Sequence, residues 1–177
     1  MLPKELKPIG FDSWDKETWE TYRSRLELAD DEALRQFYRQ VVYDHFDHFN
    51  DRYPALDLDA YQISLYTITA AEAVANIRFF RSNSSYREMT RWCSQYDEFE
   101  RKNQDYPVFR YMRKNGTAPF PPVLIDACKL EHDHYIYGKP LHLIEGTHRI
   151  SYLTRMLQRR IVLPNSVHEF VVLEPKE

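Results

Sequence analysis

Cysteine is scarce in this sequence. The chain of 177 residues has only two cysteines, Cys93 and Cys128, which stand far apart, and neither has the surroundings of a reactive nucleophile. Such a pattern is not that of a secreted domain held together by disulfides. The segment from Met1 to Pro8 also lacks the apolar core of a secretion signal. We therefore expect a protein of the reducing cytoplasm.

An excess of positive charge and long apolar stretches are missing as well. The 24 lysines and arginines are outnumbered by 27 aspartates and glutamates, which gives a net charge of −3. Proteins that bind duplex nucleic acid usually carry a basic footprint, so this balance argues against nucleic acid as a partner. The sequence has no uninterrupted apolar span of the length of a membrane helix, and we expect no membrane partner.

The first two thirds of the chain show helical spacing. Apolar and aromatic residues recur at intervals of three and four, after candidate capping residues that include Asp12, Ser13 and Asp31. Small residues over 69–76 favour a helix that approaches its neighbours closely. The pattern predicts helices over residues 14–28, 31–53, 57–80, 86–99 and 106–115, and Gly116 is expected to end the last one in the left-handed conformation.

The pattern changes after Gly116. Pro119, Pro121 and Pro122 cannot lie inside a helix, and short β-rich apolar runs follow them. These runs predict strands over residues 123–126, 135–137, 141–145 and 167–173. The sequence therefore predicts an α+β fold, in which a helical region, residues 1–116, packs on a small mixed β-sheet region, residues 117–177, as one compact body.

The stretch LHLIEGTHRISYL, in the last quarter of the chain, contains the most specific pattern. A predicted strand ends at Glu145, and a helix is predicted to begin just after Gly146. The first N–H groups of a helix lack internal partners and lie at the positive end of its dipole, so they bind anions. Glycine lets a ligand approach the backbone, and Thr147, His148 and Arg149 offer hydrogen-bond donors. The corner is a candidate anion-binding site.

The same segment, with PVLID before it and VVL after it, resembles the ParB/sulfiredoxin-like superfamily. Members of that superfamily have a strand that ends in a Gly-x-x-Arg or Gly-x-His-Arg turn, and the turn binds nucleotide phosphates. The resemblance covers under a third of the chain. It implies that Glu145 lies near the reacting group, as a candidate catalytic residue, and that the phosphate is bound by Gly146, Thr147, His148 and Arg149.

Two features depart from particular members of the superfamily. Sulfiredoxins carry a cysteine where this chain has Thr147, so the reduction of a sulfinic acid is not expected. Partition proteins follow the motif with a helix-turn-helix domain, whereas this sequence continues for about one further strand. A partition function is not expected either.

A second interpretation of the corner needs no ligand. A strand, a glycine and a helix with a buried arginine between them form a common junction in α/β proteins. In that case Arg149 holds the strand and the helix together. Its removal would then lower the stability of the protein, and no ligand affinity would be lost.

Two histidine pairs have the spacing of partial metal sites. His45 and His48 lie three residues apart in a predicted helix, and His132 and His134 alternate in an extended segment. Charged clusters on helices are usually solvated surface, and no third ligand is fixed by the spacing around His132 and His134. We predict no metal site at either pair.

Two classes of function remain open. The first is a phosphate- or nucleotide-binding protein, a class that includes phosphoryl-transfer and hydrolytic enzymes, with Glu145 as a general base. The second is a non-catalytic interaction protein, such as the immunity partner of a bacterial toxin, whose acidic surface binds a basic protein. Small size, mild acidity and 13 tyrosines suit the second class. The sequence identifies no cofactor.

Overall fold

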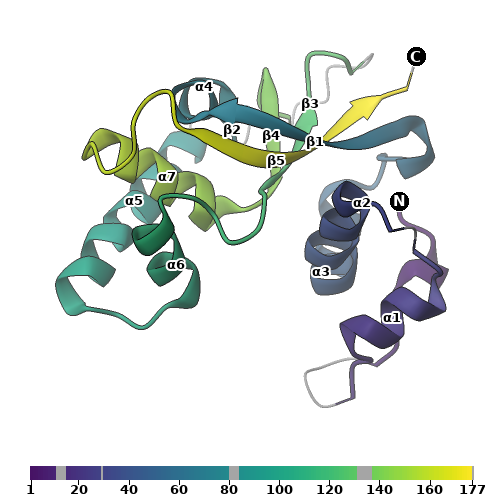
Figure 1. Ribbon diagram of the computed structural model, residues 1–177. Helices are drawn as coiled ribbons and strands as arrows, with labels where there is room; N and C mark the ends of the chain where they lie inside the picture. The colour runs from purple at the N-terminus through teal and green to yellow at the C-terminus, as the bar shows by residue number, and fades with distance from the viewer. Residues whose placement is uncertain (11–14, 29, 80–83, 131–136, 177) are drawn as a thin grey trace. The chain divides into compact units, whose positions relative to one another are not determined.

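The computed structural model describes residues 1–10, 15–28, 30–79, 84–130 and 137–176. The chain divides into two compact units, whose elements are labelled in Figure 1. Unit 1 comprises residues 1–64 and 174–177, and unit 2 comprises residues 65–173. Unit 1 is therefore discontinuous in the sequence, with unit 2 inserted into it.

Unit 1 is built mainly from helices. Its α-helices are α1 (Trp19–Arg25), α2 (Glu32–Phe37) and α3 (Asp44–Arg52), and its short 3₁₀ turns are η1 (Lys4–Leu6) and η3 (Leu58–Ala60). The side chains of Thr18 and Asp31 cap α1 and α2 by accepting hydrogen bonds from backbone N–H groups of the first turn. Large side chains that are almost completely buried form the core of this unit, among them Tyr22, Phe37, Val42 and Phe49.

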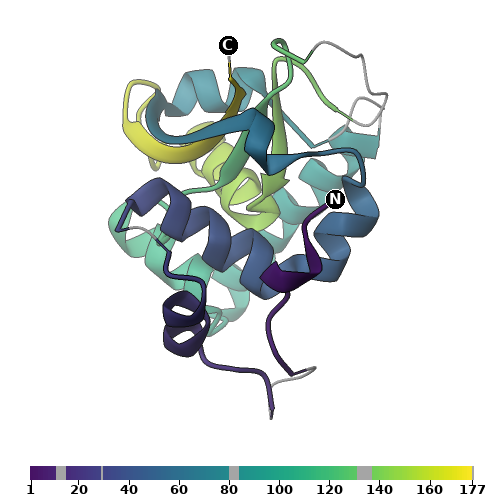
Figure 2. The same cartoon turned by 90° about the vertical axis from the view of Figure 1, so that its right-hand side faces the viewer.

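The helical backbone changes its winding between α2 and α3. Tyr38–Tyr43 forms a π-helical segment, η2, which joins the two helices directly (Figure 2). His45, near the start of α3, has non-helical backbone angles, with φ −137° and ψ 29°. The helix predicted over residues 31–53 is confirmed, but apolar spacing gives no sign of the wider turn or of the kink.

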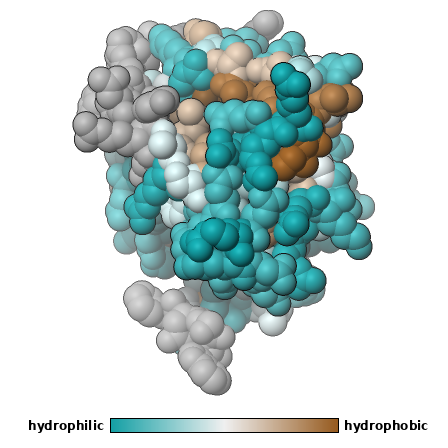
Figure 3. All heavy atoms as spheres, turned by 90° about the vertical axis from the view of Figure 1, so that its left-hand side faces the viewer, coloured by the Kyte–Doolittle hydropathy of each residue, from teal (hydrophilic) through white to brown (hydrophobic). Residues whose placement is uncertain are grey.

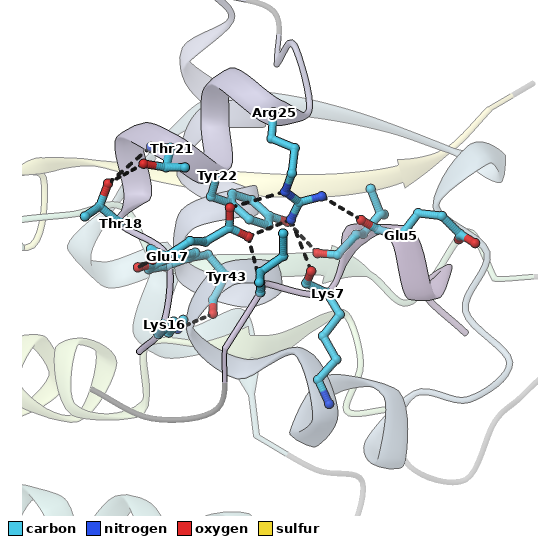
Figure 4. A network of polar contacts seen from close by, with 11 residues as sticks. Glu5, Lys7, Lys16, Glu17, Thr18, Thr21, Tyr22, Arg25 and Tyr43 are labelled. Carbon is cyan, nitrogen blue, oxygen red and sulfur yellow. Dashed lines mark hydrogen bonds and ion pairs between the residues drawn. The ribbon is translucent and has the colours of Figure 1, made fainter. Parts of the chain in front are cut away.

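Arg25, the last residue of α1, connects three segments of unit 1 (Figure 4). Its guanidinium donates to the carboxylate of Glu17 at 2.6 and 3.2 Å, and to the carbonyls of Glu5 and Lys7 at 3.1 and 3.2 Å. The Glu17 side chain is only 7% exposed, and its hydrogen bond with Arg25 lowers the pKa of its carboxyl group. The contacts fix the irregular N-terminal segment against α1.

The described residues form one mixed sheet of five strands, in the order β1-β5-β3-β4-β2. Its strands are β1 (Tyr61–Thr69), β2 (Ile77–Arg78), β3 (Val123–Asp126), β4 (Leu141–Glu145) and β5 (Val167–Pro175). β3 runs antiparallel to β4 and parallel to β5, and β2 runs parallel to β4. Leu124 lies between Leu143 and Val172 on the neighbouring strands, so the centre of the sheet is apolar.

Four helices belong to unit 2 within the described residues: α4 (Ala70–Asn76), α5 (Ser84–Lys102), α6 (Pro107–Asn115) and α7 (Thr147–Gln158). α7 packs against the other three, and Figure 1 shows α5, α6 and α7 close together. Burial of the apolar face of α7 explains this central place, because most of its side chains are enclosed. The core around it includes Tyr96, Phe109, Met112, Tyr152, Met156 and Phe170.

The helix predicted over residues 57–80 is wrong for most of its length. Tyr61–Thr69 forms β1, only Ala70–Asn76 is α-helical, and Ile77–Arg78 forms β2. Aromatic and β-branched residues dominate β1 and favour an extended chain. The alanine run is a separate short helix, which begins at a capping box of Thr69 and Glu72.

Most of the other predicted elements agree with the structure. The helices over 86–99 and 106–115 and the strands over 123–126, 141–145 and 167–173 are confirmed, and Gly116 ends α6 with a φ of 74°. The first helix begins at Trp19, later than predicted, and its proposed capping residues Asp12 and Ser13 lie outside the described residues. Residues 135 and 136 of a further predicted strand also lie outside them, and Tyr137, the one described residue of that prediction, is not in a strand. An α+β fold is confirmed, with two of its strands in the part predicted to be helical.

Across the described parts of the chain, no helix combines the length and the apolarity that a bilayer crossing requires.

Candidate functional site

The predicted corner lies in unit 2, where β4 passes into α7. β4 ends at Glu145, Gly146 takes the N-cap position, and α7 begins at Thr147. Gly146 has a φ of 111°, which is a left-handed conformation that other residues adopt only with strain. No side chain of the N-cap residue satisfies the first turn of α7, in contrast to α1, α2 and α4. The strand–glycine–helix junction therefore forms as the sequence predicted.

Gly146 is required for a second reason, which is space. A Cβ atom at this position would come within 2.8 Å of Pro122 Cβ and within 3.2 Å of the guanidinium nitrogens of Arg149. Real Cβ atoms do not approach other carbon atoms so closely, because repulsion rises steeply at this distance. The glycine lets the loop before β3 and the arginine of α7 meet at one point.

Arg149 points into the protein. Its side chain is 9% exposed, and it donates to the carbonyl oxygens of Phe120 at 3.1 Å and of Pro121 at 3.5 Å. Burial lowers the pKa of its guanidinium to about 10, so the group remains protonated at neutral pH. The arginine thereby fastens the loop before β3 to the start of α7.

Glu145 neutralises this arginine. Its carboxylate forms an ion pair with the Arg149 guanidinium, four residues further along the chain, and its side chain is 28% exposed. A buried charge is tolerated when an opposite charge and hydrogen bonds satisfy it, and Arg149 has both. Glu145 and Arg149 together form a closed, neutral pair at the base of the corner.

His148 lies in an aromatic cluster. Its ring centroid is 4.2 Å from that of Trp92, 5.7 Å from that of Tyr106 and 5.8 Å from that of Tyr152. The cluster joins three elements, because Trp92 belongs to α5, Tyr106 precedes α6, and the other two belong to α7. Burial lowers the pKa of His148, so its imidazole is neutral at physiological pH.

The corner thus brings all five predicted residues into one turn but gives them different surroundings. Thr147 and His148 are partly exposed and Gly146 is buried, whereas Glu145 and Arg149 are engaged with each other. An anion at this point would meet the first N–H groups of α7, the hydroxyl of Thr147 and a neutral imidazole. A general base at Glu145 would first have to leave its ion pair.

Trp92 and Tyr106 were not predicted as site residues. Their helical spacing with other aromatic residues favoured a role in the core, and both do pack against α7. No local motif connects them with the corner, because Trp92 lies more than 50 residues before His148 in the sequence. The packing of α5 and α6 on α7 brings Trp92 and Tyr106 to the corner.

A metal site has no support in the described residues, where no three His, Cys, Asp or Glu side chains gather in a way that could hold an ion. The rings of His45 and His48 lie 6.5 Å apart beside a cavity of about 200 Å³ in unit 1. Lys7 and Lys16 line the same cavity and form ion pairs with the neighbouring aspartates. His132 and His134 lie outside the described residues.

The charges of the chain divide unequally between the two units. Unit 2 carries 15 lysines and arginines against 11 aspartates and glutamates, a net charge of +4 with neutral histidine. Unit 1 carries 9 against 16, a net charge of −7. The net charge of −3 for the whole chain therefore conceals a basic unit, and the candidate anion site lies in that unit.

No protein-family profile matches the sequence, and no curated protein or solved structure is significantly similar to it.

Proposed function

We propose that the protein binds a phosphate group, free or as part of a nucleotide, at the start of α7. The observation that carries the proposal is the conformation of Gly146, which opens the first turn of α7 without a capping side chain. Unpaired N–H groups and the positive end of the helix dipole favour an anion there. The net charge of +4 on unit 2 acts in the same direction.

In this proposal the five residues divide into two roles. Gly146, Thr147 and His148 contact the phosphate through backbone N–H groups, a hydroxyl and an imidazole. Arg149 and Glu145 hold the turn in shape, because their charges already compensate each other. A catalytic role for Glu145 in phosphoryl transfer or hydrolysis requires that the bound phosphate compete for Arg149 and release the carboxylate. The proposal includes the ParB/sulfiredoxin-like type of fold for this region, on the basis of the Gly-Thr-His-Arg turn that follows β4.

Calorimetric titration with inorganic phosphate, ATP and CTP tests the proposal. Thr147→Val removes a hydroxyl and keeps the side-chain volume. The loss of one hydrogen bond of about 0.5–1.5 kcal/mol should weaken binding roughly two- to twelvefold. Thr67→Val, an exposed change on β1, is the matched control and should leave affinity unchanged. His148→Ala should weaken binding by a similar factor.

The pH dependence gives an independent check. The pKa of His148 is lowered by burial, so its imidazole gains a proton only below its usual titration range. Phosphate affinity should rise as the pH falls through that lowered value, and the rise should vanish in His148→Ala. Absence of binding heat with all three ligands would overturn the proposal.

The net charge of −7 on unit 1 favours a second function, that of an interaction protein such as a toxin immunity protein. Acidic surfaces attract basic proteins and accelerate their association. Titration of the whole chain with a panel of basic bacterial nucleases, at about 50 and 300 mM salt, tests this function. A stoichiometric complex that weakens with salt supports it, and absence of any complex at the lower salt concentration rejects it.

A cytoplasmic location is part of the proposal. Cys93 is buried and Cys128 is exposed, and both are free thiols. An exposed free thiol is stable in a reducing compartment, where glutathione and thioredoxin prevent its oxidation. Fractionation of the producing cell with an antibody against the chain tests the location directly.

A further inference from the structure

Three hydroxyl- and imidazole-bearing side chains of unit 2 form a hydrogen-bonded row outside the corner at α7. Nε2 of His168 lies 3.0 Å from Oγ of Ser166, and Nδ1 of the same ring lies 3.2 Å from Oγ1 of Thr117. His168 belongs to β5, Ser166 precedes that strand, and Thr117 follows Gly116 after α6. A nucleophile, a base and a group that orients the base are thus arranged in sequence.

Burial fixes the orientation of the histidine. His168 is 5% exposed, and both of its ring nitrogens have a hydroxyl partner. When Nδ1–H donates to Thr117, Nε2 carries the free lone pair and faces Ser166. The hydroxyl of Thr117 can accept this hydrogen bond, so the row accommodates the tautomer in which the ring can take the serine proton.

The proton of Ser166 has two acceptors within reach. Oγ lies 2.8 Å from the carbonyl oxygen of Leu163 and 3.0 Å from Nε2 of His168. A rotation of the O–H bond alone moves the hydrogen bond from the carbonyl to the imidazole, with no change in heavy-atom positions. When the ring proton is on Nδ1, this rotation directs the serine proton to Nε2 of His168.

Exposed apolar residues stand on both sides of Ser166 in the sequence. Leu163 is 66% exposed, Val167 is 61% exposed and Ile161 is 43% exposed. Figure 3 shows a patch of hydrophobic side chains on the face that lies on the left in Figure 1. Exposed apolar groups at such a site provide a surface for the apolar part of a substrate. Asn165 precedes the serine directly, and its amide is a candidate donor to a developing oxyanion.

We infer that Ser166 is a nucleophile activated by His168, which accepts an acyl group from an ester with a small apolar acyl chain. The serine oxygen attacks the ester carbonyl carbon while Nε2 of His168 takes the hydroxyl proton. The bond to the alcohol then breaks, and His168 returns the proton to the leaving oxygen. Water attacks the acyl-serine by the same proton transfers and releases a carboxylic acid and the free serine. Thr117 acts as a positioning residue.

The test uses the full chain, p-nitrophenyl butyrate and a fluorophosphonate probe. Mass spectrometry should locate the fluorophosphonate adduct on Ser166, and Ser166→Ala should abolish both the adduct and ester hydrolysis. His168→Gln should lower the hydrolysis rate by roughly a hundredfold or more. Ser94 is the internal control, because its exposed hydroxyl also donates to a carbonyl, that of Thr90, but has no histidine partner among the described residues.

A conservative variant of Thr117 distinguishes a positioning role in catalysis from a purely structural role. Thr117→Val should lower the rate and alter its pH profile, and Thr117→Ser should restore both. Because His168→Gln changes a buried side chain, the wild-type pH profile is a second measure that needs no variant. Burial lowers the pKa of His168, so the rate should reach half its maximum below pH 6.5. An adduct absent from Ser166, equal labelling of Ser94, or a flat pH profile would each overturn the inference.

Discussion

Replacement of Arg149 by methionine should destabilise unit 2 strongly. The change keeps most of the side-chain volume but removes the guanidinium that pairs with the carboxylate of Glu145 and donates to the carbonyls of Phe120 and Pro121. Loss of one member of a buried ion pair typically costs about 3–5 kcal/mol. Because Glu145 is 28% exposed and water can solvate part of its charge, we expect about 2–4 kcal/mol here. The melting temperature should fall by roughly 10 °C or more.

Urea titration followed by hydrogen-exchange mass spectrometry suits this measurement, because peptides from unit 2 report separately from those of unit 1. Arg155→Met is the matched control on the same helix. Its ion pair with Asp97 is 34% and 37% exposed on the two sides, so its loss should cost at most about 1 kcal/mol. The double variant Glu145→Gln, Arg149→Met should recover part of the loss, because no uncompensated charge remains.

An Arg149→Met variant that is as stable as Arg155→Met and loses phosphate affinity at least tenfold would contradict a structural role for the ion pair. That result would make Arg149 a ligand-binding residue, and its buried contacts would then be of minor energetic importance. A double variant that is less stable than Arg149→Met would also contradict the ion-pair account, because a neutral amide should be a better neighbour of an apolar side chain than the carboxylate of Glu145 is.

Two further substitutions probe the turn and unit 1. Gly146→Ala should destabilise unit 2 by roughly 2–4 kcal/mol in urea titration, because of its left-handed φ and the close contact with Pro122. Gly116→Ala should cost about 1–2 kcal/mol, because among the described residues its new Cβ would meet a single side-chain atom, of Val162, at 3.7 Å. In unit 1, Arg25 lowers the pKa of Glu17, so this pair stabilises the fold above the usual carboxyl pKa of about 4.3 and loses its effect as the pH falls through the lowered value. Glu17→Gln should therefore show a smaller loss of stability between about pH 5 and pH 3 than the wild type, in urea titrations at each pH, and an identical slope would contradict the assignment.

The sequence predicts local features of this fold better than long-range ones. Asp31 before a run of helical spacing and Gly116 after another mark true helix ends, because caps depend on a few adjacent residues. β1 was missed because a strand is stabilised by its pairing with β5, about 100 residues later in the chain. The adjacent alanines favoured one long helix, and nothing local contradicted that interpretation.

For the candidate site, too, the sequence predicted the local structure and missed the long-range contacts. The motif correctly placed residues 145–149 in a turn between a strand and a helix. It did not reveal the direction of Arg149, since the carbonyls that accept its hydrogen bonds lie nearly 30 residues earlier. It also gave no sign of the row formed by Ser166, His168 and Thr117, because Thr117 comes from a different part of the chain.

The insertion of unit 2 into unit 1 has a consequence for folding during synthesis. Lys176 completes unit 1 through its backbone N–H, which donates to the carbonyl of Ala60 at 2.9 Å, and its side chain, which donates to that of Asp59 at 2.8 Å. Every residue of unit 2 leaves the ribosome before Lys176 does. Unit 1 therefore gains its last contacts only after all of unit 2 has been synthesised, although N-terminal units generally fold first. The buried side chains of the unit 1 helices lie within residues 1–64, so these helices can pack early, and the contacts of Lys176 with Asp59 and Ala60 form last.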